Sequence, residues 1–177
     1  MDETRCLYVL RHAKSSWDDA SLPDHERPLS PRGRRAVKLL AAYVEVNEIR
    51  PELVLCSTAR RTRDTLEGVL TNGGTVLTEP GLYDASCSDV VERLRRVPPE
   101  THSVMVVGHN PAMQMLVLRL ARGEDQLEDS PESLSDIQRK FPTGALATLT
   151  FPAPWAELGA HCAELVGYVR PKSLLYQ

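Results

Sequence analysis

The chain has 177 residues, of which 42% are hydrophobic and 25% are charged, and its net charge is −3. This composition is typical of a soluble globular protein with a sizeable core, and it argues against intrinsic disorder. The small negative charge gives no indication of nucleic acid or a membrane as a partner. The sequence shows no long apolar run and no charged-then-apolar N-terminus, so we expect neither a membrane span nor a signal peptide.

The cysteines indicate a reducing environment. Cys6, Cys56, Cys87 and Cys162 are far apart and form no CxxC pair. This spacing favours reduced thiols over a disulfide framework or a zinc site. We therefore expect a cytoplasmic protein, and the sequence indicates no metal and no cofactor.

The N-terminal part predicts a strand followed by a long helix. Residues 4–10 are an apolar run typical of a buried strand. Residues 30–49 predict a helix, because Ser30 is a suitable N-cap and Pro31 suits the first helical position. The apolar face of this helix would consist of Val37, Leu40, Ala41 and Val44.

A second strand and helix follow directly. Residues 52–56 are apolar and lead into a helical pattern over 58–70, with Ser57 as the expected N-cap. The Asn-Gly-Gly stretch at 72–74 is expected to end that helix. A third, short strand is predicted at 75–78.

The third quarter of the chain repeats this alternation. Residues 88–97 predict an amphipathic helix. The uninterrupted apolar character of residues 102–108 is typical of a strand that is covered on both faces. Asn110, followed by proline, predicts the start of a helix over 112–122.

The last part completes a single domain. The acidic residues 124–136 are interpreted as an exposed connection rather than a partner site. Residues 145–151 and 162–169 predict two final strands, which we expect to add to the sheet in antiparallel fashion. The alternation of strands and helices over 1–177, without a repeat or linker, predicts an α/β three-layer sandwich with a mainly parallel sheet.

Polar residues follow several of these strands. In open α/β sheets the ligand site lies beyond the carboxyl ends of the strands. Each polar residue taken alone is common on protein surfaces, but their combination at several strand ends favours a site. The residues expected at this edge are Arg11, His12, Ser57, Arg60, Arg61, Tyr83, Asp84 and His109.

Two histidines and at least two arginines suit the chemistry of a phosphate group. Guanidinium groups match phosphate oxygens in a bidentate fashion and keep their charge. A neutral imidazole can attack phosphorus, and a second one can stabilise the equatorial oxygens. Phosphoryl transfer depends mainly on positioning and charge stabilisation, so such a site can act without a metal.

Three motifs resemble those of the histidine phosphatase superfamily, whose fold is phosphoglycerate-mutase-like. They are RHA at 11–13, STARR at 57–61 and VGHNP at 107–111. A closer resemblance, to the short SixA-like branch of phosphohistidine phosphatases, is carried by LRHAKSSW, ERPLSPRG and PTGALATL. The resemblance covers nearly the whole chain.

The resemblance implies a role for each catalytic candidate. His12 would be the nucleophile that becomes phosphorylated. Arg11 and Arg61 would bind the phosphoryl oxygens, and His109 would stabilise the transferring group. Arg61 fits because it stands four residues after the motif's serine, whereas Arg60 points about 100° away on a helix.

Other positions are candidates of lower rank or departures from the family pattern. Asp84 stands where the family often has its proton donor. Ala13 replaces the usual glycine, and Asp18 replaces an asparagine; its carboxylate would repel a phosphate dianion, so we expect it to be turned away. The candidate substrate-binding residues are Lys14, Ser15, Ser16, Ser57 and Arg60.

The nature of the leaving group favours protein phosphohistidine as the substrate. A sugar alkoxide needs a proton from a well-placed acid. A phosphohistidine protonated on its other ring nitrogen expels neutral imidazole, whose conjugate acid has a pKa of only ~6.5. The short chain also indicates an open site that a protein could approach.

Three other functions are alternatives to this one. The first is a small-molecule phosphomonoesterase acting on sugar or nucleotide phosphates, and the second is a non-catalytic phosphate-binding domain. The third, a tyrosine phosphatase built on Cys56, would need an arginine after five intervening residues, where the chain has Thr62. Cys56 is therefore interpreted as a buried strand residue.

Overall fold

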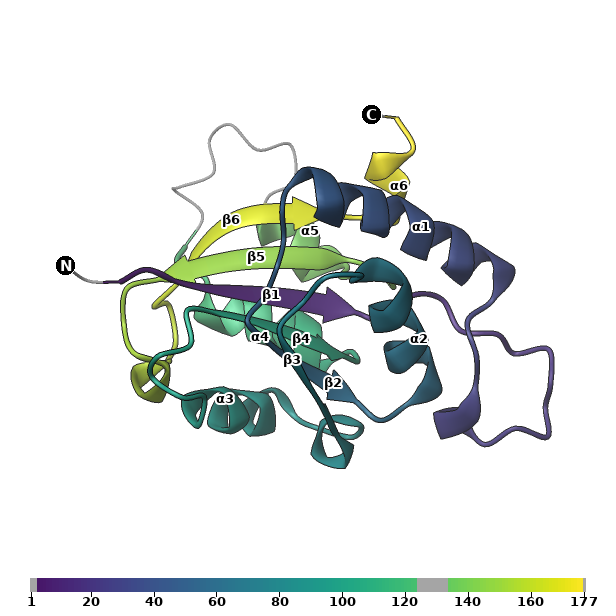
Figure 1. The fold of residues 1–177 in the computed structure, drawn as a ribbon, viewed down its shortest axis with the longest axis horizontal. Helices are drawn as coiled ribbons and strands as arrows, with labels where there is room; N and C mark the ends of the chain where they lie inside the picture. The colour runs from purple at the N-terminus through teal and green to yellow at the C-terminus, as the bar shows by residue number, and fades with distance from the viewer. Residues whose placement is uncertain (1–2, 124–133, 177) are drawn as a thin grey trace.

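The computed structural model describes residues 3–123 and 134–176, and within them one six-stranded sheet forms the centre of the molecule (Figure 1). Its order is β3-β2-β4-β1-β5-β6. The first four are parallel, β5 is antiparallel to β1, and β6 is antiparallel to β5. The strands are β1 (Arg5–Arg11), β2 (Leu53–Ser57), β3 (Thr75–Glu79), β4 (Ser103–Gly108), β5 (Leu146–Phe151) and β6 (Glu164–Val169).

Helices cover both faces of this sheet, which confirms the predicted α/β sandwich (Figure 1). Alternate residues of a strand face opposite sides. Leu53 and Leu55 therefore pack in one core, and Val54 and Cys56 in the other. The first core includes α3 (Cys87–Arg95), α4 (Ala112–Leu120) and α5 (Leu134–Arg139), and the second includes α1 (Pro31–Val46), α2 (Arg60–Val69) and the short α6 (Pro171–Leu174).

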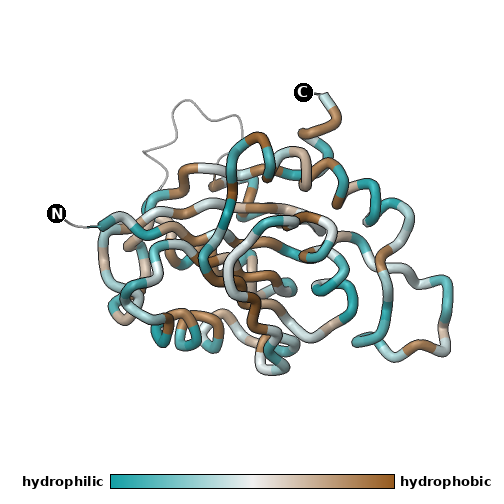
Figure 2. Tube along the Cα trace, viewed as in Figure 1, coloured by the Kyte–Doolittle hydropathy of each residue, from teal (hydrophilic) through white to brown (hydrophobic). Residues whose placement is uncertain are grey.

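Burial on both sides explains the apolar strands of the sequence. Figure 2 shows hydrophobic segments in the central strands and hydrophilic ones along the outer helices and loops. Three 3-10 turns complete the described elements: η1 (Asp24–Glu26), η2 (Pro80–Leu82) and η4 (Trp155–Glu157). No helix within the described residues is long and apolar enough to span a membrane.

The predicted starts of three helices had different outcomes. Ser30 caps α1 as predicted, since its Oγ accepts a hydrogen bond from the backbone N–H of Gly33 at 3.0 Å. Ser57 as the cap of α2 is wrong, because it is the last residue of β2 and the N-cap position is Ala59. Asn110 is not the N-cap of α4 as predicted. Pro111 takes the N-cap position, and Asn110 lies one residue before it.

The acidic connection predicted at 124–136 lies mostly outside the described residues, at 124–133. Its last three residues belong to α5, which begins at Leu134. The other predicted helices and strands are present, and their ends differ from the prediction by at most three residues.

Candidate active site

Two histidines meet because β1 and β4 are adjacent parallel strands. Arg11 is paired in register with Gly108, so the residues that follow, His12 and His109, leave the same edge of the sheet. The backbone N–H of His12 donates to the Gly108 carbonyl at 3.1 Å, and the two imidazole ring centroids are 5.3 Å apart. The prediction that these strand ends converge is confirmed.

His12 is buried, with 7% of its surface exposed, and its hydrogen bond fixes which ring nitrogen carries the proton. Nδ1 lies 2.7 Å from the carbonyl oxygen of Ala13. Because a carbonyl oxygen only accepts, Nδ1 is the protonated nitrogen and Nε2 keeps its lone pair. Burial, together with the nearby His109 and arginines, lowers the pKa of His12 to about 3. The ring is therefore neutral and nucleophilic at physiological pH.

His109 is also neutral, and its two nitrogens have different partners. Its Nδ1 accepts from Nη2 of Arg61 at 3.4 Å, so Nε2 carries the proton and donates to Oγ of Ser57 at 2.8 Å. Burial and the charge of Arg61 lower the pKa of His109 to about 4. An incoming phosphate dianion would favour the protonated form of this ring.

Two guanidinium groups stand beside the histidines. Arg11 donates from Nη1 to the carbonyl oxygen of Phe141 at 3.0 Å. Burial and the charge of Arg61 lower the pKa of Arg11. Arg61 is buried, with 9% exposure. Two guanidinium groups near the same pair of histidines are suited to binding phosphoryl oxygens.

Asp24 belongs to this cluster, although it was not among the candidate residues predicted from the sequence. Its backbone carbonyl accepts from Nη1 of Arg61 at 2.9 Å, and its Oδ2 accepts from Nη2 at 3.0 Å. The hydroxyl of Tyr83 donates to the same Oδ2 at 2.5 Å. This hydrogen bond and Arg61 lower the pKa of Asp24, so it is a carboxylate at neutral pH.

The surrounding side chains connect η1 to the rest of the cluster. Nε2 of His25 lies 2.9 Å from Oγ1 of Thr58, and the rings of His25 and Tyr83 are 4.9 Å apart. Tyr83 in turn lies edge-on to His109, with the ring centroids 5.5 Å apart. The segment before α1 therefore closes over Arg61. The signal available in the sequence was the polar run PDHE ahead of the RPLS stretch.

The structure does not bring every candidate into the cluster. Arg60 points outward, with 48% of its side chain exposed and an ion pair to Asp64 at 3.6 Å. Asp84 and Asp18 are exposed, and their carboxylates make no hydrogen bond or ion pair with a described residue.

The residues after the nucleophile serve different purposes. Ser16 is engaged within its own loop, since its backbone N–H donates to the Pro28 carbonyl and its Oγ accepts from the N–H of Asp18. Ser15 forms a backbone bridge with Leu29. Lys14 is exposed and lines a second cavity.

Cys56 is a buried strand residue, as expected from the sequence. It has 0% exposure, and burial raises the pKa of its thiol to about 12. A thiol in this state is not a nucleophile at neutral pH. Elsewhere in the described part of the chain, no three His, Cys, Asp or Glu side chains gather in a way that could hold a metal ion.

Known proteins resemble this chain over most of its length. The family model of the histidine phosphatase superfamily (branch 1) matches residues 7–89. An uncharacterised protein of Mycobacterium tuberculosis is 35% identical over 164 residues, which cover 92% of this chain and 100% of that protein. The phosphohistidine phosphatase SixA of Escherichia coli is 32% identical over 153 residues, which cover 81% of this chain and 84% of SixA.

A solved structure extends the likeness beyond residue 89. It comes from Nakamurella multipartitia, is assigned to SixA, and is 30% identical with a TM-score of 0.81, covering 95% of this chain and 96% of that one. The fold is thus the phosphoglycerate-mutase-like sandwich of the SixA structures. The chain belongs to the histidine phosphatase superfamily, and this membership supports phosphatase activity.

Proposed function

We propose that this protein is a metal-independent phosphatase that removes the phosphoryl group from phosphohistidine on a protein, through a phosphorylated His12. The observation that carries the proposal is the state of His12: a buried, neutral imidazole whose Nδ1–H is held by Ala13 and whose Nε2 is unprotonated. The phosphoryl group is transferred twice, first to this nitrogen and then to water.

In the first step, the lone pair of His12 Nε2 forms a bond to phosphorus while the P–N bond of the substrate breaks. The bonding electrons go to the substrate nitrogen, which leaves as neutral imidazole if its other nitrogen is protonated. In the second step, water attacks phosphorus while the bond between phosphorus and His12 Nε2 breaks. The bonding electrons return to Nε2, and a proton of the attacking water passes to solvent. The hydrogen bond from Nδ1–H to Ala13 keeps the phosphorylated ring protonated, so His12 also leaves as neutral imidazole.

The cations around His12 would stabilise the transferring group. Arg11 and Arg61 offer guanidinium donors, and His109 offers its ring N–H once the negative charge of phosphate has entered the site. These fixed donors supply the positive charge that a metal ion supplies in other phosphoryl-transfer sites.

Among the described residues of the cluster, no protonated carboxyl group is available as a donor, and this supports phosphohistidine over alkyl phosphates. Asp24 is held as a carboxylate by Tyr83 and Arg61, so it has no proton to give at neutral pH. Asp84 stays a prediction as a proton donor, and the proposed reaction does not depend on it. A phosphohistidine substrate is consistent with such a site, because its leaving nitrogen needs no proton from the enzyme. The proposal includes a cytoplasmic location, which the four free cysteines fit.

The test compares hydrolysis of a phosphohistidine protein, a sugar phosphate and an aryl phosphate by the wild type and His12→Ala. We expect phosphohistidine to be hydrolysed with the highest kcat/KM, a loss of at least about a thousandfold in His12→Ala, and no effect of EDTA. His102→Ala, a change in a half-exposed histidine outside the cluster, serves as the control.

A quenched-flow experiment with labelled substrate tests the intermediate. Acid-labile label should appear on the wild type and be absent from His12→Ala. Wild-type turnover by His12→Ala would rule out the mechanism, and a preference for the sugar phosphate would favour a small-molecule phosphomonoesterase.

A further inference from the structure

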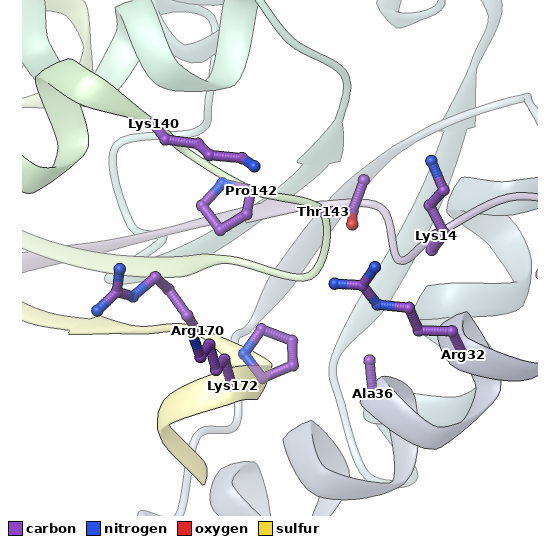
Figure 3. Close-up of a pocket in the computed structure, with 9 residues that line it drawn as sticks. Lys14, Arg32, Ala36, Lys140, Pro142, Thr143, Arg170 and Lys172 are labelled. Carbon is purple, nitrogen blue, oxygen red and sulfur yellow. The ribbon is translucent and has the colours of Figure 1, made fainter. Parts of the chain in front are cut away.

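A second cavity, of about 200 Å³, lies beside the candidate active site (Figure 3). Its position follows from the sheet topology, because β6 is antiparallel to β5 and therefore runs in the direction of β1. Arg170, the first residue after β6, thus emerges at the same edge as Lys14, which stands two residues beyond the nucleophile. The cavity is lined by Lys14, Arg32, Ala36, Lys140, Pro142, Thr143, Arg170, Pro171 and Lys172.

The lining contains five cationic side chains and no carboxylate. Figure 3 shows that they come from separate segments, with Arg32 on α1 and Lys172 on α6. Among the described residues, no ion pair or side-chain hydrogen bond engages Lys14, Arg32, Lys140 or Lys172. The chain as a whole has a net charge of −3, so this concentration of positive charge is local and opposite to the average.

Other cavities of the molecule do not share this imbalance. One of about 460 Å³ has Arg34, Lys38 and Arg60 in its lining, but also Asp64 and Glu67. Another, of about 290 Å³, combines two arginines with three carboxylates. In both, opposite charges stand close together and reduce repulsion. The lining of the cavity beside the nucleophile contains no carboxylate that could act in this way.

We propose that this cavity is a second anion site, which binds a compact oxyanion carrying two or more negative charges, such as a diphosphate group. The like charges of Lys14, Arg32, Lys140 and Lys172 line one cavity, and a multiply charged anion would offset the repulsion between them. Arginine and lysine side chains together with the hydroxyl of Thr143 offer donors suited to phosphate oxygens. The ring walls of Pro142 and Pro171 limit the size of the ligand.

The site borders the nucleophile through the backbone. Two residues span at most about 7 Å, so Lys14 stays close to His12. Next to Thr143, the N–H of Gly144 donates to the carbonyl oxygens of Arg11 at 3.1 Å and His12 at 2.9 Å. An anion in the cavity could thus be free, or it could be a second charged group on the phosphoprotein substrate. The latter source rests on the proposed function, whereas binding of the anion does not.

Calorimetric titration with inorganic diphosphate tests the site directly. The wild type should bind two equivalents, one at the arginines of the active site and one in the cavity. A double charge reversal, Arg32→Glu with Lys172→Glu, should leave one equivalent. The matched control is Arg35→Glu with Lys38→Glu, which changes the same charge at exposed positions of α1 outside the cavity and should keep two.

Two results would overturn the second site: one equivalent bound by the wild type, or two retained by the cavity variant. All four substituted residues are exposed, so folding should be preserved. The double variant Arg32→Gln with Lys172→Gln, which removes the two charges without reversing them, provides a milder check. It should bind the second equivalent of diphosphate with at least tenfold lower affinity than the wild type.

Steady-state kinetics identify the source of the anion. If the group belongs to the substrate protein, the cavity variant should raise KM for the phosphohistidine protein at least tenfold. Its kinetics on an aryl phosphate should stay within twofold of the wild type. An unchanged KM, together with a lost second diphosphate, would assign the site to a free anion. Absence of phosphohistidine hydrolysis in the wild type would refute the proposed function and leave the binding result standing.

Discussion

Two groups of cationic side chains border the same edge of the sheet, and they differ in how their charge is balanced. In the candidate active site, Arg61 is paired with Asp24 and both histidines are held neutral. In the second cavity, five cations share a lining that contains no carboxylate. A carboxylate thus balances Arg61 in the first group, whereas the lining of the second contains none.

The two groups also differ in how firmly they are held. Arg61 is buried and bound through both terminal nitrogens, whereas Lys14, Arg32, Lys140 and Lys172 are exposed. Donors fixed in advance can match the geometry of a transition state, while long exposed side chains mainly contribute charge. The buried, fixed group is therefore suited to chemistry, and the exposed, flexible group to binding.

The largest effect in this comparison is expected when the planar guanidinium of Arg61 is replaced while the positive charge is kept. In Arg61→Lys, kcat/KM for the phosphohistidine protein should fall by about 100- to 1000-fold, because an ammonium group cannot form the same bidentate contacts. In the second cavity, Arg32→Lys should keep both equivalents of diphosphate, since charge alone is required there.

Arg60→Lys is the matched control for this prediction. Its side chain points outward to Asp64, so kcat/KM should stay within about threefold of the wild type. Equal losses in the Arg60 and Arg61 variants would show that the integrity of α2, and not the guanidinium group of Arg61, determines activity.

A smaller effect is expected when the charge balance of the active site is removed. Asp24→Asn keeps an oxygen acceptor for Arg61 but removes the carboxylate that competes with phosphate for the same guanidinium. Inorganic phosphate should therefore inhibit this variant at concentrations about 3- to 10-fold lower than in the wild type.

The control for Asp24 is Asp19→Asn, a change in the same loop. The carboxylate of Asp19 is engaged only with Ser21 among the described residues, so phosphate inhibition should be unchanged. A weaker inhibition of Asp24→Asn by phosphate would mean that Asp24 orients Arg61 more than it competes with the anion.

The placement of four candidate residues at one edge could be predicted because it depends on local sequence. Arg11 ends β1, His12 and His109 directly follow β1 and β4, and Arg61 lies in the first turn of the helix after β2. Parallel neighbours in a sheet bring such positions to one edge. This reasoning needs only the alternation of strands and helices.

The remaining features depend on contacts that no local pattern records. Asp24 and Arg61 are 37 residues apart in the sequence, and their pairing results from the path of the loop before α1. Ser57 has the right residue type for a helix cap, but it is the last residue of β2, and its hydroxyl contacts both the N–H of Ala59 and His109. The second cavity collects charges from four segments, so its excess of cations is visible only in the folded chain.

The smallest expected effect concerns the neutral state of His12. The pKa of this histidine is about 3 in the folded protein, below the ~6.5 of an unfolded chain. The unfolded state therefore binds more protons than the folded state between these pH values. The contribution of His12 to the free energy of unfolding is fully present above pH ~6.5 and is lost as the pH falls toward the pKa of the folded state. From pH 7 to pH 5, this histidine should reduce the free energy of unfolding by about 1–2 kcal/mol.

Thermal unfolding of the wild type and of His12→Asn at pH 7 and pH 5 tests this expectation. The Tm of both proteins should decrease over this range, and the decrease should be a few degrees smaller in His12→Asn, about 2–4 °C for each kcal/mol. His102→Asn, at a half-exposed histidine outside the cluster, is the control substitution. Parallel curves for His12→Asn and the wild type would mean that His12 is not held neutral in the folded state, and the contrast between neutral histidines in the candidate active site and cations in the second cavity would no longer hold.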